Sequence, residues 1–277
     1  AVLNEVAIMQ SLSGNKYTVQ LMDFYEEDDH FFLVMEYCAG GDVFDRIVQY
    51  VQYTENDARA LAITLLKAVE SLHKVGIAHR DIKPQNLFLL SPTDNSTIRV
   101  GDFGFARRVH TPESLTSRVG TPTYVAPEIL KNLPHDERVD LWSVGVVIFV
   151  LLVGYSPFLD ENQSNLFRKI RTGEWVFFEK DWKNISEEAK ELVRGLLKVD
   201  PKDRWTVERC LRCSWIRQDS KRLSSNDLSV AVRQLQQIKA RLRMPAGLFM
   251  GIDEKCQSVD ATTQAQTTAS GAAMFHK

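Results

Sequence analysis

The stretch His79-Arg80-Asp81-Ile82-Lys83-Pro84-Gln85-Asn86 places a carboxylate, an ammonium group and an amide within eight residues. Two shorter strings follow it, Asp102-Phe103-Gly104 and Ala126-Pro127-Glu128. Carboxylate and amide oxygens such as those of Asp102 and Asn86 suit a hard cation. A glycine directly after an acidic residue gives the backbone the freedom that a metal-binding turn needs. The order and spacing of the strings therefore predict a polar site assembled from three loops.

In this order and at these intervals, the strings resemble the catalytic loop, the metal-binding loop and the end of the activation segment of eukaryotic protein kinases. The resemblance covers about residues 2–216. It implies an α+β, two-lobed protein-kinase-like fold with a truncated small lobe and a mainly helical large lobe. It also implies transfer of the γ-phosphoryl group of ATP, with Mg²⁺, to serine or threonine hydroxyls of proteins.

The resemblance gives the catalytic residues their expected roles. Asp81 accepts or orients the proton of the attacking hydroxyl, and Lys83 stabilises charge on the moving phosphoryl group. Asn86 and Asp102 hold the metal ions. Lys83 together with Thr121, in Gly-Thr-Pro-Thr-Tyr, resembles the serine/threonine branch of the family.

Several residues correspond to the nucleotide-binding positions of the family: Glu5, Met35, Glu36, Cys38, Asp42, Gln85, Asn86, Phe88 and Asp102. The stretch 35–38 resembles the gatekeeper and the hinge, whose backbone groups read adenine. Asp42 corresponds to an acidic position near the ribose and near a basic substrate residue. Gln85 stands where a Glu is common, and Phe88 stands where a Leu is common beneath adenine.

Three charged residues resemble structural positions of the family. Asp140 corresponds to the helix residue that supports the backbone of the catalytic loop. Glu128 and Arg204 match the partners of a buried ion pair beneath the activation segment. Arg80, beside Asp81, is a cation in need of an anion, and we hypothesise that a phosphate on Ser117 or Thr116 supplies it.

Glu5 corresponds to the helix glutamate that pairs with a nucleotide-binding lysine, yet no Gly-rich loop and no strand lysine precede it. We therefore expect a fragment of a longer kinase, weakly active by itself, with two small-lobe strands that have an open edge. The alternative is a catalytically impaired scaffold or pseudokinase that binds another protein. A metabolite phosphotransferase is a more distant alternative.

The composition is that of an ordinary soluble protein: 277 residues, 44% hydrophobic, 25% charged, with a net charge of −2. So small a charge argues against nucleic acid or a membrane surface as the partner. The apolar run 144–153 is about half of the ~20 residues that cross a bilayer. Four cysteines in a chain of this length form no disulfide framework. We expect a soluble, cytoplasmic protein.

Hydrophobic periodicity predicts a helix over 2–12, strands over 17–25 and 31–37, and a short helix to about 51. Thr54 and Asp57 form a capping-box pattern at the start of a long helix. Short strands are expected at 87–90 and 98–100, and helices at 138–153, 163–172, 186–197 and 206–210. The expected units are a partial small lobe (1–37), the large lobe (38–216), a linker with a regulatory helix (217–256), its stretch 220–226 linker-like, and a disordered tail (257–277).

The segment 228–243 places apolar residues at helical intervals and arginines and lysines on other faces. Together with the stretches 41–47 and 154–162, it resembles the calcium/calmodulin-dependent group of kinases. The resemblance implies an autoinhibitory and calmodulin-binding segment, so that calmodulin or another regulator is a partner beside the protein substrates. The alternative is a basic helix that simply packs on the large lobe.

Overall fold

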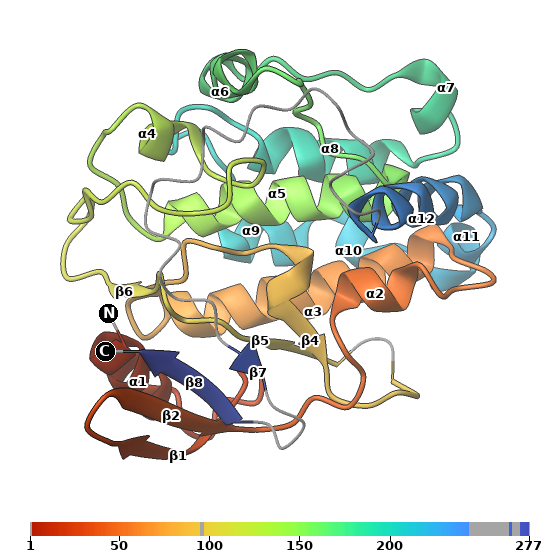
Figure 1. Cartoon of the computed structure of the whole chain (residues 1–277). Coiled ribbons are helices and arrows are strands. Elements are labelled where there is room, and N and C mark those ends of the chain that lie inside the picture. The colour runs from red at the N-terminus through yellow and green to blue at the C-terminus, as the bar shows by residue number, and fades with distance from the viewer. Residues whose placement is uncertain (1, 95–96, 244–265, 268–271, 277) are drawn as a thin grey trace.

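The computed structural model describes residues 2–94, 97–243, 266–267 and 272–276. The fold is α+β and consists of a small lobe with an incomplete set of elements and a mainly helical large lobe, as predicted (Figure 1). In the small lobe, α1 (Val2–Ser11) is followed by the antiparallel strands β1 (Leu21–Glu26) and β2 (His30–Met35).

The prediction that 257–277 is disordered is wrong for two strands, β7 (Gln266–Thr267) and β8 (Ala272–His276). The small-lobe sheet has the order β1-β2-β8-β7, and β8 is antiparallel to β2 (Figure 1). The edge of β2 that the sequence left open has unpaired N–H and C=O groups, and pairing with β8 satisfies them. The other residues of the predicted tail, and those from 244 to 256, lie outside the described residues.

The elements of the large lobe follow in chain order (Figure 1). Its helices are α2 (Val43–Ile47), α3 (Glu55–His73), η1 (Pro84–Asn86), α4 (Pro127–Leu130), α5 (Arg138–Val153), α6 (Gln163–Thr172), α7 (Glu179–Trp182), α8 (Glu187–Leu196), α9 (Val207–Arg212), α10 (Ser214–Arg217), α11 (Ser220–Ser224) and α12 (Ser229–Arg243). Two short antiparallel pairs accompany them: β3 (Ile77–Ala78) with β6 (Arg107–Arg108), and β4 (Leu87–Leu89) with β5 (Ile98–Val100).

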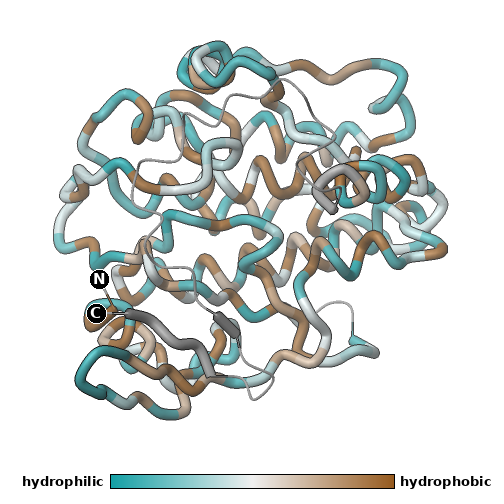
Figure 2. Tube along the Cα trace, in the orientation of Figure 1, coloured by the Kyte–Doolittle hydropathy of each residue, from teal (hydrophilic) through white to brown (hydrophobic). Residues whose placement is uncertain are grey.

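Helix α5 forms the centre of the large lobe. Every residue from Val139 to Val153 is buried, and Figure 2 shows hydrophobic residues along this helix. Gly145 allows α8 to approach closely, since a Cβ on it would lie 2.8 Å from the Cβ of Leu196. A helix that is apolar all round belongs in the interior of a protein, so the predicted core helix is confirmed.

Helix α3 begins with the predicted capping box. The Thr54 hydroxyl accepts a hydrogen bond from the Asp57 N–H at 3.4 Å, and the Asp57 carboxylate accepts one from the Thr54 N–H at 2.8 Å. The two side chains satisfy orphan N–H groups of the first turn. The C-terminal end of α3 leads directly into β3 and the catalytic-loop sequence.

Two local predictions differ from the structure. Residues 17–20 are not part of β1; instead the Val19 N–H donates to the Val100 carbonyl at 2.9 Å, which joins this stretch to β5. The stretch 220–226, expected to be a linker, contains α11. Asp219 caps this helix by accepting from the Lys221 N–H at 3.0 Å, and Leu223 is fully buried. The polar composition of 220–226 predicted a linker, and the one leucine in it gave no sign that it is buried.

The implied ion pair beneath the activation segment is present. The two guanidinium nitrogens of Arg204 lie 2.8 and 3.0 Å from the two carboxylate oxygens of Glu128, and both side chains are buried. Arg204 also donates to the Arg138 carbonyl at 2.6 Å. This bidentate geometry connects α4, which follows the activation segment, to the loop before α9.

Among the residues that the structure describes, none of the helices combines the length and the hydrophobicity required to cross a bilayer.

Candidate active site

The backbone of the catalytic loop is held by one buried carboxylate on α5. Asp140 accepts hydrogen bonds from the His79 N–H at 2.9 Å and the Arg80 N–H at 2.7 Å. Burial alone would raise the pKa of Asp140, but its hydrogen bond with His73 at 3.0 Å and nearby positive charge outweigh that effect, so the pKa lies below its usual range. His73 was not predicted from the sequence, because its contact with Asp140 joins residues 67 positions apart.

Asp81 lies at the centre of a compact polar cluster and is only 2% exposed. The Lys83 ammonium lies 2.6 Å from one carboxylate oxygen, and Asn86 Nδ2 donates to the same oxygen at 3.1 Å. The other oxygen accepts from the Thr121 hydroxyl at 2.7 Å and the Thr121 N–H at 3.0 Å. Lys83 also donates to the Thr121 hydroxyl at 3.0 Å. A carboxylate with this many donors is held in one orientation.

The β4–β5 hairpin places the two predicted metal ligands at the same end of neighbouring strands. Asn86 directly precedes β4, and its carbonyl accepts from the N–H of Gly101, which directly follows β5, at 2.9 Å. Asp102 is the next residue, with a left-handed φ of 59° and an exposed side chain. Since Asn86 Nδ2 donates to Asp81, the amide oxygen of Asn86 is left for a cation.

The chemistry of these donors fits Mg²⁺ bound together with phosphate. No group of three or more His, Cys, Asp or Glu residues that could hold a metal occurs within the described parts of the chain. Mg²⁺ is usually held by one or two protein oxygens, with water and substrate phosphates as the other ligands. Asn86 and Asp102 match that donor set.

Phe103 is packed inward and fully buried, with its ring centroid 5.1 Å from that of His79 in an edge-on arrangement. The imidazole Nε2 of His79 in turn lies 3.0 Å from the Gly101 carbonyl. Because Phe103 is anchored in the core, the neighbouring Asp102 is directed outward. The apolar contact between the two loops therefore positions Asp102, the predicted metal ligand.

The carboxylate of Glu5 lies close to that of Asp102. The sequence alone did not indicate this proximity. A Cβ on Gly104 would lie 3.4 Å from an Asp102 carboxylate oxygen and 3.7 Å from one of Glu5, so both carboxylates flank this glycine. Burial, followed by the negative charge of Asp102, raises the pKa of Glu5 from 4.5 to about 7. Among the described side chains, Glu5 forms no ion pair.

The predicted hinge has backbone groups that remain available to a ligand. The Glu36 side chain faces away from them, toward Arg99 Nε at 3.3 Å. Across the described residues, neither the Glu36 carbonyl nor the Cys38 N–H makes a hydrogen bond. An unpaired acceptor and donor two residues apart are what the edge of an adenine ring requires. Burial raises the pKa of the Cys38 thiol to about 11, so the thiol is neutral.

The other predicted nucleotide residues differ in how firmly they are held. Asp42 caps α2 by accepting from the Asp45 N–H at 2.8 Å, and its backbone pairs with that of Phe88. The Phe88 ring packs on Gly101, where a Cβ would lie 2.8 Å from a ring carbon. Gln85, in contrast, is exposed. Asp42 and Phe88 therefore lie at the β4–β5 hairpin, whereas Gln85 lies at the surface.

Arg80 connects the catalytic loop to the activation segment. Its guanidinium donates to the Ser117 hydroxyl at 2.6 Å and to the Phe105 carbonyl at 2.7 and 2.9 Å. Burial, with a contribution from the positive charge of Arg107, lowers the pKa of Arg80 to about 10. Arg80 also has a left-handed φ of 67°. Ser117, one of the two residues hypothesised to carry a phosphate, is therefore in contact with Arg80.

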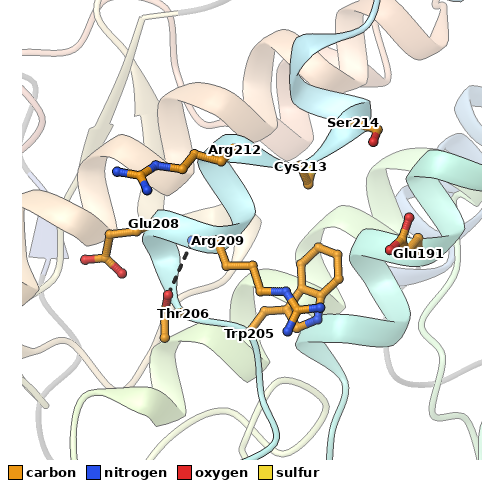
Figure 3. A pocket seen from close by; sticks show the side chains of 8 residues that line it. All are labelled: Glu191, Trp205, Thr206, Glu208, Arg209, Arg212, Cys213 and Ser214. Carbon is orange, nitrogen blue, oxygen red and sulfur yellow. Dashed lines mark hydrogen bonds between the residues drawn. The ribbon is translucent and has the colours of Figure 1, made fainter.

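A separate depression of about 510 Å³ lies between α8, α9 and the start of α10 (Figure 3). Two arginines and two glutamates lie around it, and the Arg209 guanidinium lies 4.2 Å from the ring centroid of Trp205. Figure 3 shows Arg209 stacked over this ring and Glu191 across the opening. None of the predicted catalytic or nucleotide-binding residues lines this depression.

We predict that Glu5 makes the stability of this chain depend on pH. Because its pKa is raised on folding, its contribution to stability is fully present below about pH 4.5 and is lost as the pH rises through about 7. The free energy of unfolding should fall by ~3 kcal/mol across this interval, at 1.36 kcal/mol for each pKa unit. Urea denaturation at several pH values measures the fall.

The Glu5→Gln variant should lack this component, whereas Glu27→Gln, a substitution in the exposed turn before β2, should retain it. Equal pH dependence in Glu5→Gln and the unaltered chain would show that Glu5 titrates normally.

Comparison with known proteins identifies the family of this chain. Residues 1–216 match the protein kinase domain. Calcium/calmodulin-dependent protein kinase type 1 of Macrobrachium nipponense is 43% identical over 213 residues, which are 77% of this chain and 61% of that protein. The human type 1B protein is 42% identical over 219 residues, or 79% of this chain and 63% of the relative.

The rat type 1B protein is 40% identical over 240 residues, which cover 87% of this chain and 69% of that protein. The chain spans less than two thirds of the length of the first two relatives. The matched region includes every residue of the site, from Glu5 to Thr121. On this evidence, the chain belongs to the protein kinase family.

Proposed function

We propose that this chain transfers the γ-phosphoryl group of ATP to serine or threonine hydroxyls of proteins. The observation that supports the proposal most directly is the Asp81 cluster. A buried carboxylate, an ammonium group and a hydroxyl are joined by hydrogen bonds of 2.6–3.0 Å. Phosphoryl transfer depends mainly on such fixed charges around the reacting groups.

In the proposed reaction the substrate hydroxyl binds beside Asp81, which orients it and receives its proton. Lys83 lies 2.6 Å from Asp81 and places a positive charge where the phosphoryl group moves. Thr121 contacts both groups, and because Lys83 and Thr121 resemble the serine/threonine branch of the family, a serine or threonine hydroxyl is the proposed acceptor. Mg²⁺, when bound, neutralises phosphate charge, and Asn86 and Asp102 hold it.

ATP in this proposal binds along the hinge and the β4–β5 hairpin. The Glu36 carbonyl and the Cys38 N–H read the edge of adenine, Phe88 packs beneath the ring, and Asp42 lies near the ribose. The described cysteines are free thiols, which supports action in a reducing, intracellular compartment.

One observation favours a second function. Glu5 has a raised pKa and, among the described side chains, no cationic partner, so no described cation beside Glu5 is available to bind the nucleotide phosphates. A scaffold that binds another protein through its large lobe does not need that charge. The catalytically impaired scaffold is therefore the alternative.

We predict that Asp81→Ala abolishes most of the phosphoryl transfer by this chain. Loss of a positioned general base lowers rates by about 10²–10⁴-fold. Transfer of label from γ-labelled ATP to a serine-containing protein, with Mg²⁺, measures the effect. Asp160→Asn, which alters a partly exposed carboxylate paired with Lys169, is the matched control and should retain activity.

Equal transfer by the Asp81 variant and the unaltered chain would contradict the assignment of the base. Absence of transfer, together with Mg²⁺-independent binding of a protein partner, would support the scaffold.

We further propose that phosphorylation of Ser117 stabilises the active arrangement, because its hydroxyl lies 2.6 Å from the Arg80 guanidinium. A phosphate there would form strong charge-assisted hydrogen bonds with Arg80. The Ser117→Ala, Thr116→Ala double variant should therefore not be activated by an upstream kinase, whereas the unaltered chain gains activity. Full activity of the double variant in the same assay would refute this role.

We also propose that calmodulin binds α12, since the relatives are named calcium/calmodulin-dependent kinases and α12 is amphipathic with basic flanks. Its apolar face packs on the large lobe in this structure, so calmodulin must displace it. Calorimetry of the chain with calcium-loaded calmodulin should show binding that chelation of calcium abolishes. Flat traces in calcium would favour the alternative, a basic helix that only packs on the lobe.

A further inference from the structure

The first residue of α3, at the end of this helix away from the catalytic loop, is a completely buried glutamate. Glu55 is 0% exposed. Its carboxylate accepts from the Ser186 N–H at 3.1 Å, from the Ser186 hydroxyl, and from the Trp215 indole N–H at 2.8 Å. A further donor, Asn226 Nδ2 at 2.7 Å, belongs to the segment that leads into α12. The Glu55 carboxylate is therefore hydrogen-bonded both by residues of the large lobe and by the segment that connects the large lobe to α12.

Backbone hydrogen bonds reinforce this contact. The Glu55 N–H donates to the Asn226 carbonyl at 3.0 Å, and the Leu228 N–H donates to the Tyr53 carbonyl at 2.8 Å. Thr54 and Asp227 form an antiparallel bridge between them. Residues 226–228 are thus paired with 53–55, and we call these two paired stretches the Glu55 clamp.

One helical turn after Glu55, a second charged side chain holds the same segment further upstream. Arg59 is mostly buried and donates to the Ser220 hydroxyl at 2.8 Å and to the Gln218 carbonyl. Two side chains of the first turns of α3 therefore hold the chain from 218 to 228. Removal of one partner would leave a buried charge with fewer hydrogen bonds, which is costly.

The contacts of α12 become more exposed along the helix. Ala231 packs so closely on Gly154 that a Cβ on this glycine would lie 2.3 Å from the Ala231 carbonyl oxygen. Further along, Gln236 Nε2 donates to the Val48 carbonyl at 2.8 Å. Next, Lys239, whose side chain is 17% exposed, pairs at 2.7 Å with Asp45, whose side chain is 46% exposed. Because this pair is partly open to solvent, salt screens it, and it holds α12 more weakly than the fully buried contacts of Glu55 hold the clamp.

We propose that the Glu55 clamp is a fixed pivot for α12. A regulator detaches α12 from the large lobe, starting at the end near Lys239 and proceeding to about Ser229. The chain up to Leu228 stays bound to the large lobe. The segment that a regulator can take therefore begins near Ser229. The regulatory role of this motion rests on the proposed function, but the order in which the contacts open does not.

Amide hydrogen exchange of the full chain, without any partner, tests the order of opening. Lys239→Ala should speed exchange of the amides of 236–240 by about threefold or more, while the Leu228 and Glu55 amides keep their protection. Asn226→Ala should speed exchange of Leu228 and of the whole of α12 by about tenfold or more. The exposed substitution Asn165→Ala on α6 is the control and should change neither.

Glu55→Gln is a second probe, because it keeps the side-chain volume but places an NH₂ donor among the donors around the carboxylate; it should act as Asn226→Ala does. Unchanged α12 exchange in both variants would overturn the pivot, and so would loss of Leu228 protection in Lys239→Ala. With calcium-loaded calmodulin, retained protection of Leu228 supports the proposal, and lost protection overturns it. If calmodulin does not bind, the regulator proposed above is wrong, and the exchange data still decide the pivot.

Discussion

The catalytic loop depends on a carboxylate buried in an otherwise apolar helix. Asp140 lies in the first turn of α5, where the positive end of the helix dipole favours a negative charge. Its two oxygens accept the successive N–H groups of His79 and Arg80, which fixes the backbone on the N-terminal side of Asp81. Arg80 adopts a left-handed φ, which costs energy in a residue with a side chain. The bonds to Asp140 offset that cost, so the position of Asp81 is determined from within the core.

The same arrangement occurs at two other helices. Glu128 in the first turn of α4 and Glu55 in the first turn of α3 are buried carboxylates, and each binds a segment distant in sequence. Glu128 pairs with Arg204, and Glu55 accepts from Asn226. In each case the helix start already favours the anion, and the distant donor completes its hydrogen bonding. Three long-range connections of the large lobe therefore follow one physical rule.

Much of the fold and of the site was predictable because the sequence patterns that indicate them involve only neighbouring residues. The spacing of the catalytic strings, the capping pattern of Thr54 and the apolar run of α5 each require only neighbouring residues. The predicted bounds of α5 and α6 agree with the structure. Contacts between distant segments were not predictable in this way. The approach of Glu5 to Asp102, the buried Leu223 of α11, and the pairing of β8 with β2 depend on packing that periodicity does not encode.

The site has two parts, one around Asp81 and one around Glu5 and Asp102. They differ in whether the described residues neutralise their negative charge. Around Asp81, each carboxylate oxygen has donors from this chain, and Lys83 supplies the cation. At Glu5, a buried carboxylate faces the carboxylate of Asp102, and burial raises its pKa to about 7. Two adjacent carboxylates repel each other when both are ionised, so a cation between or beside them, whether a metal ion or an ammonium group, would favour their ionised forms. The Asp81 cluster, where we propose that the substrate hydroxyl binds, is therefore electrostatically balanced by the described residues. At Glu5 and Asp102, where we propose that the phosphates bind, a nearby cation would stabilise both ionised carboxylates, so nucleotide binding should depend on that cation more than the geometry at Asp81 does.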